Sequence, residues 1–352
     1  MRTDILAALE GRAPGRVAWT IHHELLPRGS LERSLRAQGL AIIEKSVRPY
    51  REGARTVSIE ERQGWEGEIR LIHRTWHTPR GELRACVREG PDGSHWTEQY
   101  PVRSVSDFRL LEYIAQDTEY RENDAAVAAA QEALGEDGLV LCRMMRSPVQ
   151  RLLTEWMGPV GFSYALADDA PSLERLIEGL AARDEEAFAI ASRSPARAIW
   201  SAENLTGDMV GPDLFRRWHA PYYDRAARLS REGGKLYGVH MDGRLACLRE
   251  AIGACGLDFV EGFTPPPIGD LGIEEARASW PDTALWVNIP GTFFLGSRER
   301  VLAALGDIVL RALSAGRCLL TLTEEFPDPP RSLLLLSEAL AAAGLPSPTE
   351  KT

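Results

Sequence analysis

Three short apolar runs of the sequence end in acidic or imidazole side chains. The runs are residues 198–201, 235–240 and 257–261. The polar side chains at or just beyond their ends are Glu203, His240, Asp242 and Glu261. Segments of helical length separate the runs, which is the strand–helix alternation of a parallel sheet. Because the carboxyl ends of parallel strands meet at one edge and carry the ligand sites of such folds, we expect these side chains to face one another.

A ring of carboxylates around one imidazole has two chemical uses. It can ligate a divalent metal ion that acidifies water or binds a thiol or hydroxyl of a substrate. It can also act as an acid–base pair, in which burial and like charge push the pKa values of the members apart. Because converging carboxylates repel one another, a metal or a cationic substrate is the favoured occupant. The predicted catalytic residues are Glu203, His240 and Glu261. The predicted metal ligands are His240, Asp242 and Glu325, with the register between Glu324 and Glu325 left open.

Simpler structural roles remain open for two of these positions. An Asp-Gly pair after a strand, here Asp242 and Gly243, is typical of a turn that caps a helix. Glu203 could instead form an ion pair with Arg216 or Arg217.

A second set of polar residues is predicted to bind substrate. Its members are His22, His23, Arg146 and Tyr222. The two histidines lie at the tip of a predicted strand over residues 15–24, and Arg146 follows another strand, where its guanidinium could pair with a substrate carboxylate. Two alternatives stay open: one of the histidines could be hydrogen-bonded in the core, and Tyr222 could be a packing residue.

The elements that must position these residues form one repeating pattern. Eight predicted strands cover residues 15–24, 55–61, 138–144, 198–201, 235–240, 257–261, 283–288 and 317–323. Predicted helices cover residues 30–46, 104–117, 122–134, 158–192 with a break at 171–172, 298–315 and 330–343. Two alternating segments around residues 77–81 predict a β-hairpin. The pattern predicts a single (β/α)8 TIM-barrel domain over residues 1–352, with a hairpin insertion at about 65–100 after the second strand.

Composition excludes several classes of protein. The chain has 352 residues and a net charge of −10, without the dense basic run that a nucleic-acid surface needs. No apolar run approaches the roughly 20 residues that cross a bilayer, and Asp4 and Glu10 interrupt the first 16 residues where a signal peptide would be apolar. We therefore expect a cytoplasmic protein. The five cysteines lack CxxC spacing, so neither a disulfide framework nor a zinc ribbon is indicated.

Four segments resemble the uroporphyrinogen decarboxylase superfamily. They are ENLTGDMVGPDLFRRWHAPYYDRAARLSREGGKLYGVHMDG (203–243), HTPRGEL (77–83), LDFVEGF (257–263) and ALWVNIPG (284–291). In that superfamily an acidic strand end precedes a "GP…lF…P" helix, and a strand ending in H-x-C-G or a near variant follows. The likeness extends over about residues 16–343. It implies a TIM-barrel enzyme.

Within the superfamily the chain looks closer to the cobalamin-dependent methyltransferase branch. The true decarboxylases carry an N-terminal RQAGRY-like signature and a late G-H-G motif, and this chain has neither, since no histidine follows His240. In the methyltransferase branch a zinc ion is held by H-x-C and a distant cysteine. By that resemblance His240 matches the histidine, Asp242 stands where the first cysteine would be, and residues 324–326 stand near the second. The resulting ligand set is rich in oxygen, and would suit zinc, with iron or manganese as alternatives.

The resemblance therefore implies three hypotheses. The first is metal-assisted methyl transfer or demethylation linked to a corrinoid, which a partner protein could carry. The second is cofactor-free decarboxylation of a uroporphyrinogen-type tetrapyrrole or another polycarboxylate. The third is a non-catalytic protein that binds a tetrapyrrole or a corrinoid protein, because the thiolate ligands are missing. A homodimer is left open, and the substrate is expected to be a small molecule.

Overall fold

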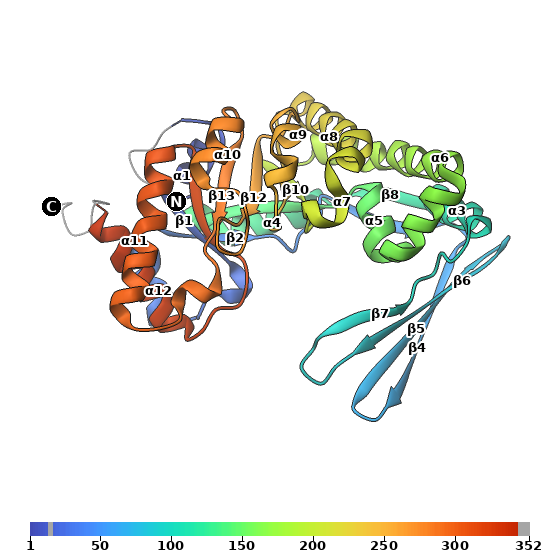
Figure 1. The fold of residues 1–352 in the computed structure, drawn as a ribbon, viewed down its shortest axis with the longest axis horizontal. Helices are drawn as coiled ribbons and strands as arrows, with labels where there is room; N and C mark the ends of the chain where they lie inside the picture. The colour runs from blue at the N-terminus through green and yellow to red at the C-terminus, as the bar shows by residue number, and fades with distance from the viewer. Residues whose placement is uncertain (13–16, 344–352) are drawn as a thin grey trace. The chain divides into compact units, whose positions relative to one another are not determined.

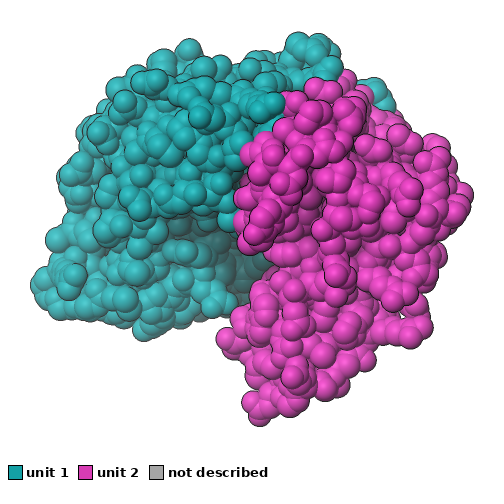
Figure 2. All heavy atoms as spheres, turned by 45° about the vertical axis from the view of Figure 1, so that its right-hand side comes forward, with its two compact units in different colours: residues 1–49, 123–145, 191–352 teal, residues 50–122, 146–190 magenta. Residues whose placement is uncertain are grey.

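The computed structural model describes residues 1–12 and 17–343. Contacts divide the chain into two compact units, coloured separately in Figure 2. Unit 1 comprises residues 1–49, 123–145 and 191–352, and unit 2 comprises residues 50–122 and 146–190. Within the described residues, no helix combines the length and the apolar character needed to cross a membrane.

Unit 1 is a closed barrel of parallel strands surrounded by helices (Figure 1). The strands follow one another around the barrel in the order β1-β14-β13-β12-β11-β10-β9-β2. Their bounds are β1 Ala18–His22, β2 Leu40–Glu44, β9 Gly138–Met144, β10 Ala198–Ser201, β11 Leu236–His240, β12 Phe259–Phe263, β13 Ala284–Asn288 and β14 Cys318–Leu322. The predicted α/β TIM-barrel class is confirmed.

Helix α1 precedes the first strand of unit 1, and its other helices lie between the strands or after the last one. Their bounds are α1 Arg2–Leu9, α2 Ser30–Ala37, α4 Asp124–Leu134, α7 Gly207–Leu214, α8 Ala220–Glu232, α9 Arg249–Gly253, α10 Ile273–Ser279, α11 Arg298–Ala315 and α12 Pro329–Ala342. The predicted helix over 298–315 agrees with α11 at both ends, because Ser297 caps its first turn and Gly316 ends it with a positive φ of 65°.

Helix α1 closes the amino ends of the barrel strands. Its buried side chains Ile5, Ala8 and Leu9 join one apolar cluster with the first inward residues of the strands. Several of these first residues are alanines: Ala18, Ala41, Ala198 and Ala284. Small side chains leave room for the helix, and burial of Ile5 and Leu9 contributes roughly 1.5–3 kcal/mol each. Polar side chains are therefore expected at the opposite, carboxyl ends of the strands.

The second strand of the barrel differs from the prediction. A helix was expected over residues 30–46 and a strand over 55–61, but α2 ends at Ala37 and β2 covers Leu40–Glu44. Gly39, at φ 93°, ends the helix, and the following Leu-Ala-Ile-Ile run is buried on both faces. An apolar run buried all round has no period that separates helix from strand, which explains the wrong prediction.

Unit 2 contains two antiparallel sheets and helices. One sheet pairs β3 (Tyr50–Ala54) with β8 (Thr118–Glu122). The other has the order β4-β5-β6-β7, with bounds β4 Ser58–Glu66, β5 Ile69–Thr78, β6 Gly81–Glu89 and β7 His95–Gln99. Strands β5 and β6 pair from Thr78 and Gly81 outward, where the sequence predicts a hairpin turn. The helices are α3 Phe108–Asp117, α5 Pro148–Arg151 and most of α6 Gly158–Arg193, which breaks at Asp169 beside Pro171.

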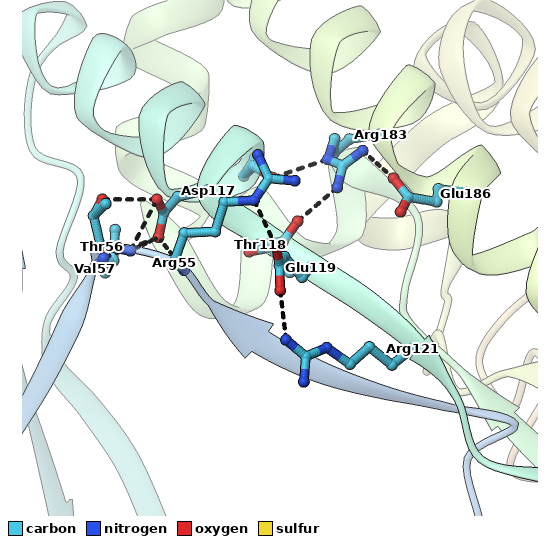
Figure 3. A network of polar contacts seen from close by, with 10 residues as sticks. Arg55, Thr56, Val57, Asp117, Thr118, Glu119, Arg121, Arg183 and Glu186 are labelled. Atoms are coloured by element: carbon cyan, nitrogen blue, oxygen red, sulfur yellow. Dashed lines mark hydrogen bonds and ion pairs between the residues drawn. The ribbon is translucent and has the colours of Figure 1, made fainter.

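A buried carboxylate fixes the connection between β3 and β4 in unit 2 (Figure 3). The Asp117 carboxylate accepts hydrogen bonds from the backbone N–H groups of Arg55, Thr56 and Val57, at 3.0, 2.9 and 2.9 Å. The Thr56 hydroxyl donates to it at 2.7 Å. Burial alone would raise the pKa of Asp117, but these donors lower it to about 2. Asp117 therefore stays charged and holds the turn.

Candidate functional site

Three buried side chains meet at the carboxyl ends of barrel strands. His22 ends β1, His240 ends β11, and Glu261 lies on β12 directly opposite His240 in the strand register. The Glu261 carboxylate accepts a hydrogen bond from His240 Nδ1 and another, at 3.3 Å, from His22 Nε2. The exposed fractions of the three residues are 2%, 8% and 1% in chain order. Both oxygens of Glu261 are thus held by imidazoles inside the barrel.

An irregularity in β12 brings Glu261 against His240. The register with β13 shifts between Glu261 and Phe263, and the intervening Gly262 has a φ of 77°. A Cβ atom at position 262 would overlap the His240 ring. Glycine is therefore required there both for the backbone angle and for the close approach of the imidazole.

The electrostatics separate the two imidazoles into different charge states. Burial opposes the charged form of His240, but the charge of Glu261 and the hydrogen bonds that His240 donates to Asp242 and Glu261 raise its pKa to about 9. Burial dominates at His22 and lowers its pKa, against the hydrogen bond to Glu261. The pKa of Glu261 is well below its usual range, because the His240 charge and the two imidazole hydrogen bonds outweigh burial. At neutral pH the set is an imidazolium, a carboxylate and a neutral imidazole.

Asp242 completes the set on the more exposed side. Its Oδ2 lies 3.5 Å from His240 Nε2, and its side chain is 44% exposed. Burial raises the pKa of Asp242, but the hydrogen bond and charge of His240 lower it overall. The two ring nitrogens of His240 therefore face two carboxylates, one enclosed and one open to solvent. This geometry stabilises the protonated ring and gives it an exchange route for its proton.

Lys45 and Trp200 lie next to this set, and sequence reasoning missed both. Lys45 directly follows β2, and its Nζ lies 5.5 Å from the centroid of the Trp200 ring. The Trp200 ring in turn meets the His240 ring edge-on, with centroids 5.8 Å apart. Burial lowers the pKa of Lys45, with Glu261 and Glu24 opposing and Arg143 reinforcing the shift. One signal was available, since the sequence has only three lysines, Lys45, Lys235 and Lys351.

Two of the predicted substrate-binding residues, His23 and Arg146, lie beside carboxylates outside this set. His23 lies in the short helix His23–Leu25, with Nδ1 3.3 Å from Glu44 Oε2. Arg146 belongs to unit 2, where its Nη1 lies 2.7 Å from Glu155 Oε1. Their predicted roles in substrate binding stay predictions.

Three further candidates are placed individually. Glu203 is fully buried just beyond β10, and its backbone N–H donates to the Ser201 carbonyl. Tyr222 is buried on α8 and packs edge-on against Tyr223, with ring centroids 6.0 Å apart. Glu325 is exposed after β14. The predicted set that the structure brings together is therefore His22, His240, Asp242 and Glu261.

The residues as placed do not fit a resident metal ion. Within residues 1–12 and 17–343, no group of three or more His, Cys, Asp or Glu side chains is arranged to hold one. Both nitrogens of His240 face carboxylates, and Glu325 is exposed. We derive no chemical step through a metal at this set, and the zinc, iron or manganese site stays a prediction.

Comparisons with known proteins support the fold assignment. No family model matches the sequence. No curated protein matches it either. Among solved structures, a methyltransferase from Methanosarcina mazei has a TM-score of 0.50 and 15% identity, over 71% of this chain and 72% of that chain.

Two further solved structures have lower scores. A Bacteroides ovatus GH5 xyloglucanase has a TM-score of 0.41 and 11% identity, over 85% of this chain and 98% of that chain. A candidate vitamin-B12-independent methionine synthase from Listeria monocytogenes has a TM-score of 0.38 and 12% identity, over 60% of this chain and 65% of that one. At such identities the likeness to the Methanosarcina protein shows a shared fold, while the superfamily resemblance of the quoted motifs stays a prediction.

Proposed function

We propose that this chain is an enzyme in which His240 gives a proton to a small substrate at the carboxyl end of the barrel, in the transfer or removal of a methyl group. The supporting observation is the position of the His240 ring between the buried Glu261 and the half-exposed Asp242, with a pKa of about 9. At neutral pH this ring is charged, so it acts first as an acid.

An acid of this kind assists the loss of a methyl group from a neutral oxygen, nitrogen or sulfur atom, because protonation stabilises the leaving heteroatom. In the proposed step a nucleophile forms a bond to the methyl carbon, the bond from carbon to the heteroatom breaks, and its electron pair goes to the heteroatom. The heteroatom then takes the proton of His240. His22, neutral because burial lowers its pKa, can accept the proton that a thiol or hydroxyl acceptor releases. Two groups with pKa values pushed apart around one carboxylate are a usual basis for assigning acid and base.

Methyl transfer is the first reaction class to test for two reasons. The quoted sequence segments resemble the cobalamin-dependent methyltransferase branch, and the Methanosarcina protein of similar fold is a methyltransferase. A barrel of this kind hosts many chemistries, so neither reason fixes the substrate. The decarboxylase and the non-catalytic binder remain the alternatives, and the same imidazolium could protonate the carbon that loses carbon dioxide.

The test is a methyl-transfer assay with donors of three types, a methoxylated aromatic, a methylamine and a methyl thioether, a thiol acceptor, and cobalamin present or absent. We expect turnover by the natural chain, and a loss of about 10²–10⁴-fold in kcat/KM in His240→Gln. The matched control is His95→Gln, which changes an exposed histidine of unit 2. Equal turnover in His240→Gln would refute the assigned acid. Turnover of a tetrapyrrole polycarboxylate in place of every methyl donor would favour the decarboxylase.

The metal is tested separately. Elemental analysis of protein purified without chelator, alongside His240→Ala and Asp242→Ala, measures whether about one ion per chain is bound and lost in both variants. A bound ion would require these side chains to rearrange, because His240 now directs both nitrogens toward carboxylates.

A further inference from the structure

Trp200 has a buried hydrogen-bond donor for which the described residues supply no acceptor, and the Lys45 ammonium lies over its ring. Trp200 is 3% exposed, and its buried Nε1–H finds no hydrogen-bond partner among residues 1–12 and 17–343. Lys45 is half-buried with its ammonium over the Trp200 ring, and no described carboxylate lies within 4.0 Å of its Nζ. A buried donor such as the Trp200 N–H is rarely left without an acceptor, because it has lost its bonds to water without replacement.

The surroundings of Lys45 indicate what would bind to it. Burial lowers the pKa of Lys45, so its ammonium has lost part of its hydration and would gain from a hydrogen-bonded anion. Glu261 and Glu24 act on Lys45 only through their charge, and both oxygens of Glu261 already accept hydrogen bonds from imidazoles. No carboxylate among the described residues therefore pairs directly with Lys45. An incoming group with anionic oxygens would accept a hydrogen bond from its ammonium.

We propose that Lys45 and Trp200 bind an anionic oxygen group of the substrate, so that the substrate is a small organic acid. The proposal rests on the proposed function, because it places the reacting part of the same molecule beside His240. The Trp200 ring lies next to both residues. The Lys45 ammonium lies over its face, and the centroid of the His240 ring lies 5.8 Å from the centroid of the Trp200 ring. Lys45 acts in recognition and orientation, while His240 supplies the proton.

The experiment measures anion binding directly and does not require turnover. The indole Nε1–H signal of Trp200 is assigned in a proton–nitrogen NMR spectrum by its loss in Trp200→Phe. The protein is then titrated with acetate, methanesulfonate and inorganic phosphate at constant ionic strength. We expect at least one of these anions to shift the Trp200 signal saturably. Lys45→Met is expected to weaken that binding about tenfold or more, and Lys45→Arg to weaken it less.

Lys235→Met is the matched control. Lys235 is also half-buried and also has a pKa lowered by burial, but it precedes β11 at the amino end of the strand. It should leave anion binding unchanged. Equal weakening in the two lysine variants would show a general charge effect and overturn the proposal. So would a Trp200 signal that none of the three anions shifts.

Failure of this proposal is distinct from failure of the proposed function. If His240→Gln abolishes methyl transfer while no anion shifts the Trp200 signal, the role of His240 as the acid is supported and the anion site at Lys45 and Trp200 is refuted. If acetate binds through Lys45 while His240→Gln turns over normally, the anion site is supported and the role of His240 as the acid is refuted.

Discussion

Unit 1 and unit 2 each contain a buried carboxylate with a lowered pKa, and the two are satisfied by different donors. In unit 2, Asp117 accepts from the backbone N–H groups of Arg55, Thr56 and Val57. In unit 1, Glu261 accepts from the side chains of His22 and His240. Backbone donors do not titrate, so Asp117 can only hold a turn. Imidazoles titrate near neutral pH, so Glu261 is coupled to groups that exchange protons.

Replacing each carboxylate by its neutral amide should lower the free energy of unfolding by different amounts. The larger loss is expected at Glu261. Glu261→Gln leaves a buried imidazolium without its enclosed partner, and we expect a loss of about 3–5 kcal/mol in the free energy of unfolding at pH 7. The pKa of His240 should fall from about 9 toward its ordinary value. Urea unfolding measures the first effect and NMR titration of the His240 ring measures the second. A His240 pKa that stays near 9 in Glu261→Gln would contradict the assigned cause.

Above neutral pH, the free energy of unfolding should depend on His240 of unit 1 and not on Asp117 of unit 2. His240 has a pKa of about 9 in the folded protein against an ordinary value of 6.5, so its stabilisation is complete below pH 6.5 and is lost as the pH rises through 9. The loss amounts to about 3 kcal/mol at 1.36 kcal/mol per pKa unit. Asp117, with a pKa lowered from 3.8 to about 2, contributes stability that is lost only as the pH falls below 3.8.

Urea unfolding at several values from pH 6 to pH 10 tests this separation. His240→Gln should remove most of the alkaline loss, and Asp117→Asn should keep it. An equal alkaline loss in the natural chain and in His240→Gln would assign the effect to other groups.

A smaller effect is expected from Asp117→Asn itself. The amide keeps one acceptor oxygen, but its NH₂ group cannot accept from the backbone N–H groups that now share the carboxylate. We expect a loss of about 1–2 kcal/mol in the free energy of unfolding. The His240 titration should not change. A shifted His240 pKa in this variant would show that the two carboxylates are coupled.

The fold was largely predictable, because apolar strand runs and helix caps recur along the chain. Strand β2 was the exception, since its apolar run carries no distinguishing period. That error also hid Lys45, which was assigned to a helix and lies at a strand end. The site was predictable in part. His240 and Glu261 follow from their places at neighbouring strand ends, whereas Glu325 lies exposed in the loop after β14. Loop conformation is set by tertiary contacts that residue types alone do not specify.

The smallest effect is expected from Arg55→Ala, which removes a side chain but keeps a backbone donor. The guanidinium of Arg55 pairs with Glu119 at 2.8 Å, and Glu119 also pairs with Arg121 at 2.8 Å (Figure 3). Exposed pairs of this kind contribute little, because water and salt screen them. The backbone N–H at position 55 still donates to Asp117 in the variant. The urea midpoint should therefore match the natural chain within measurement error, while Asp117→Asn lowers it. If Arg55→Ala lowered the urea midpoint as much as Asp117→Asn does, the stability of the turn would depend on side-chain charge. This result would contradict the contrast between backbone donors at Asp117 and side-chain donors at Glu261.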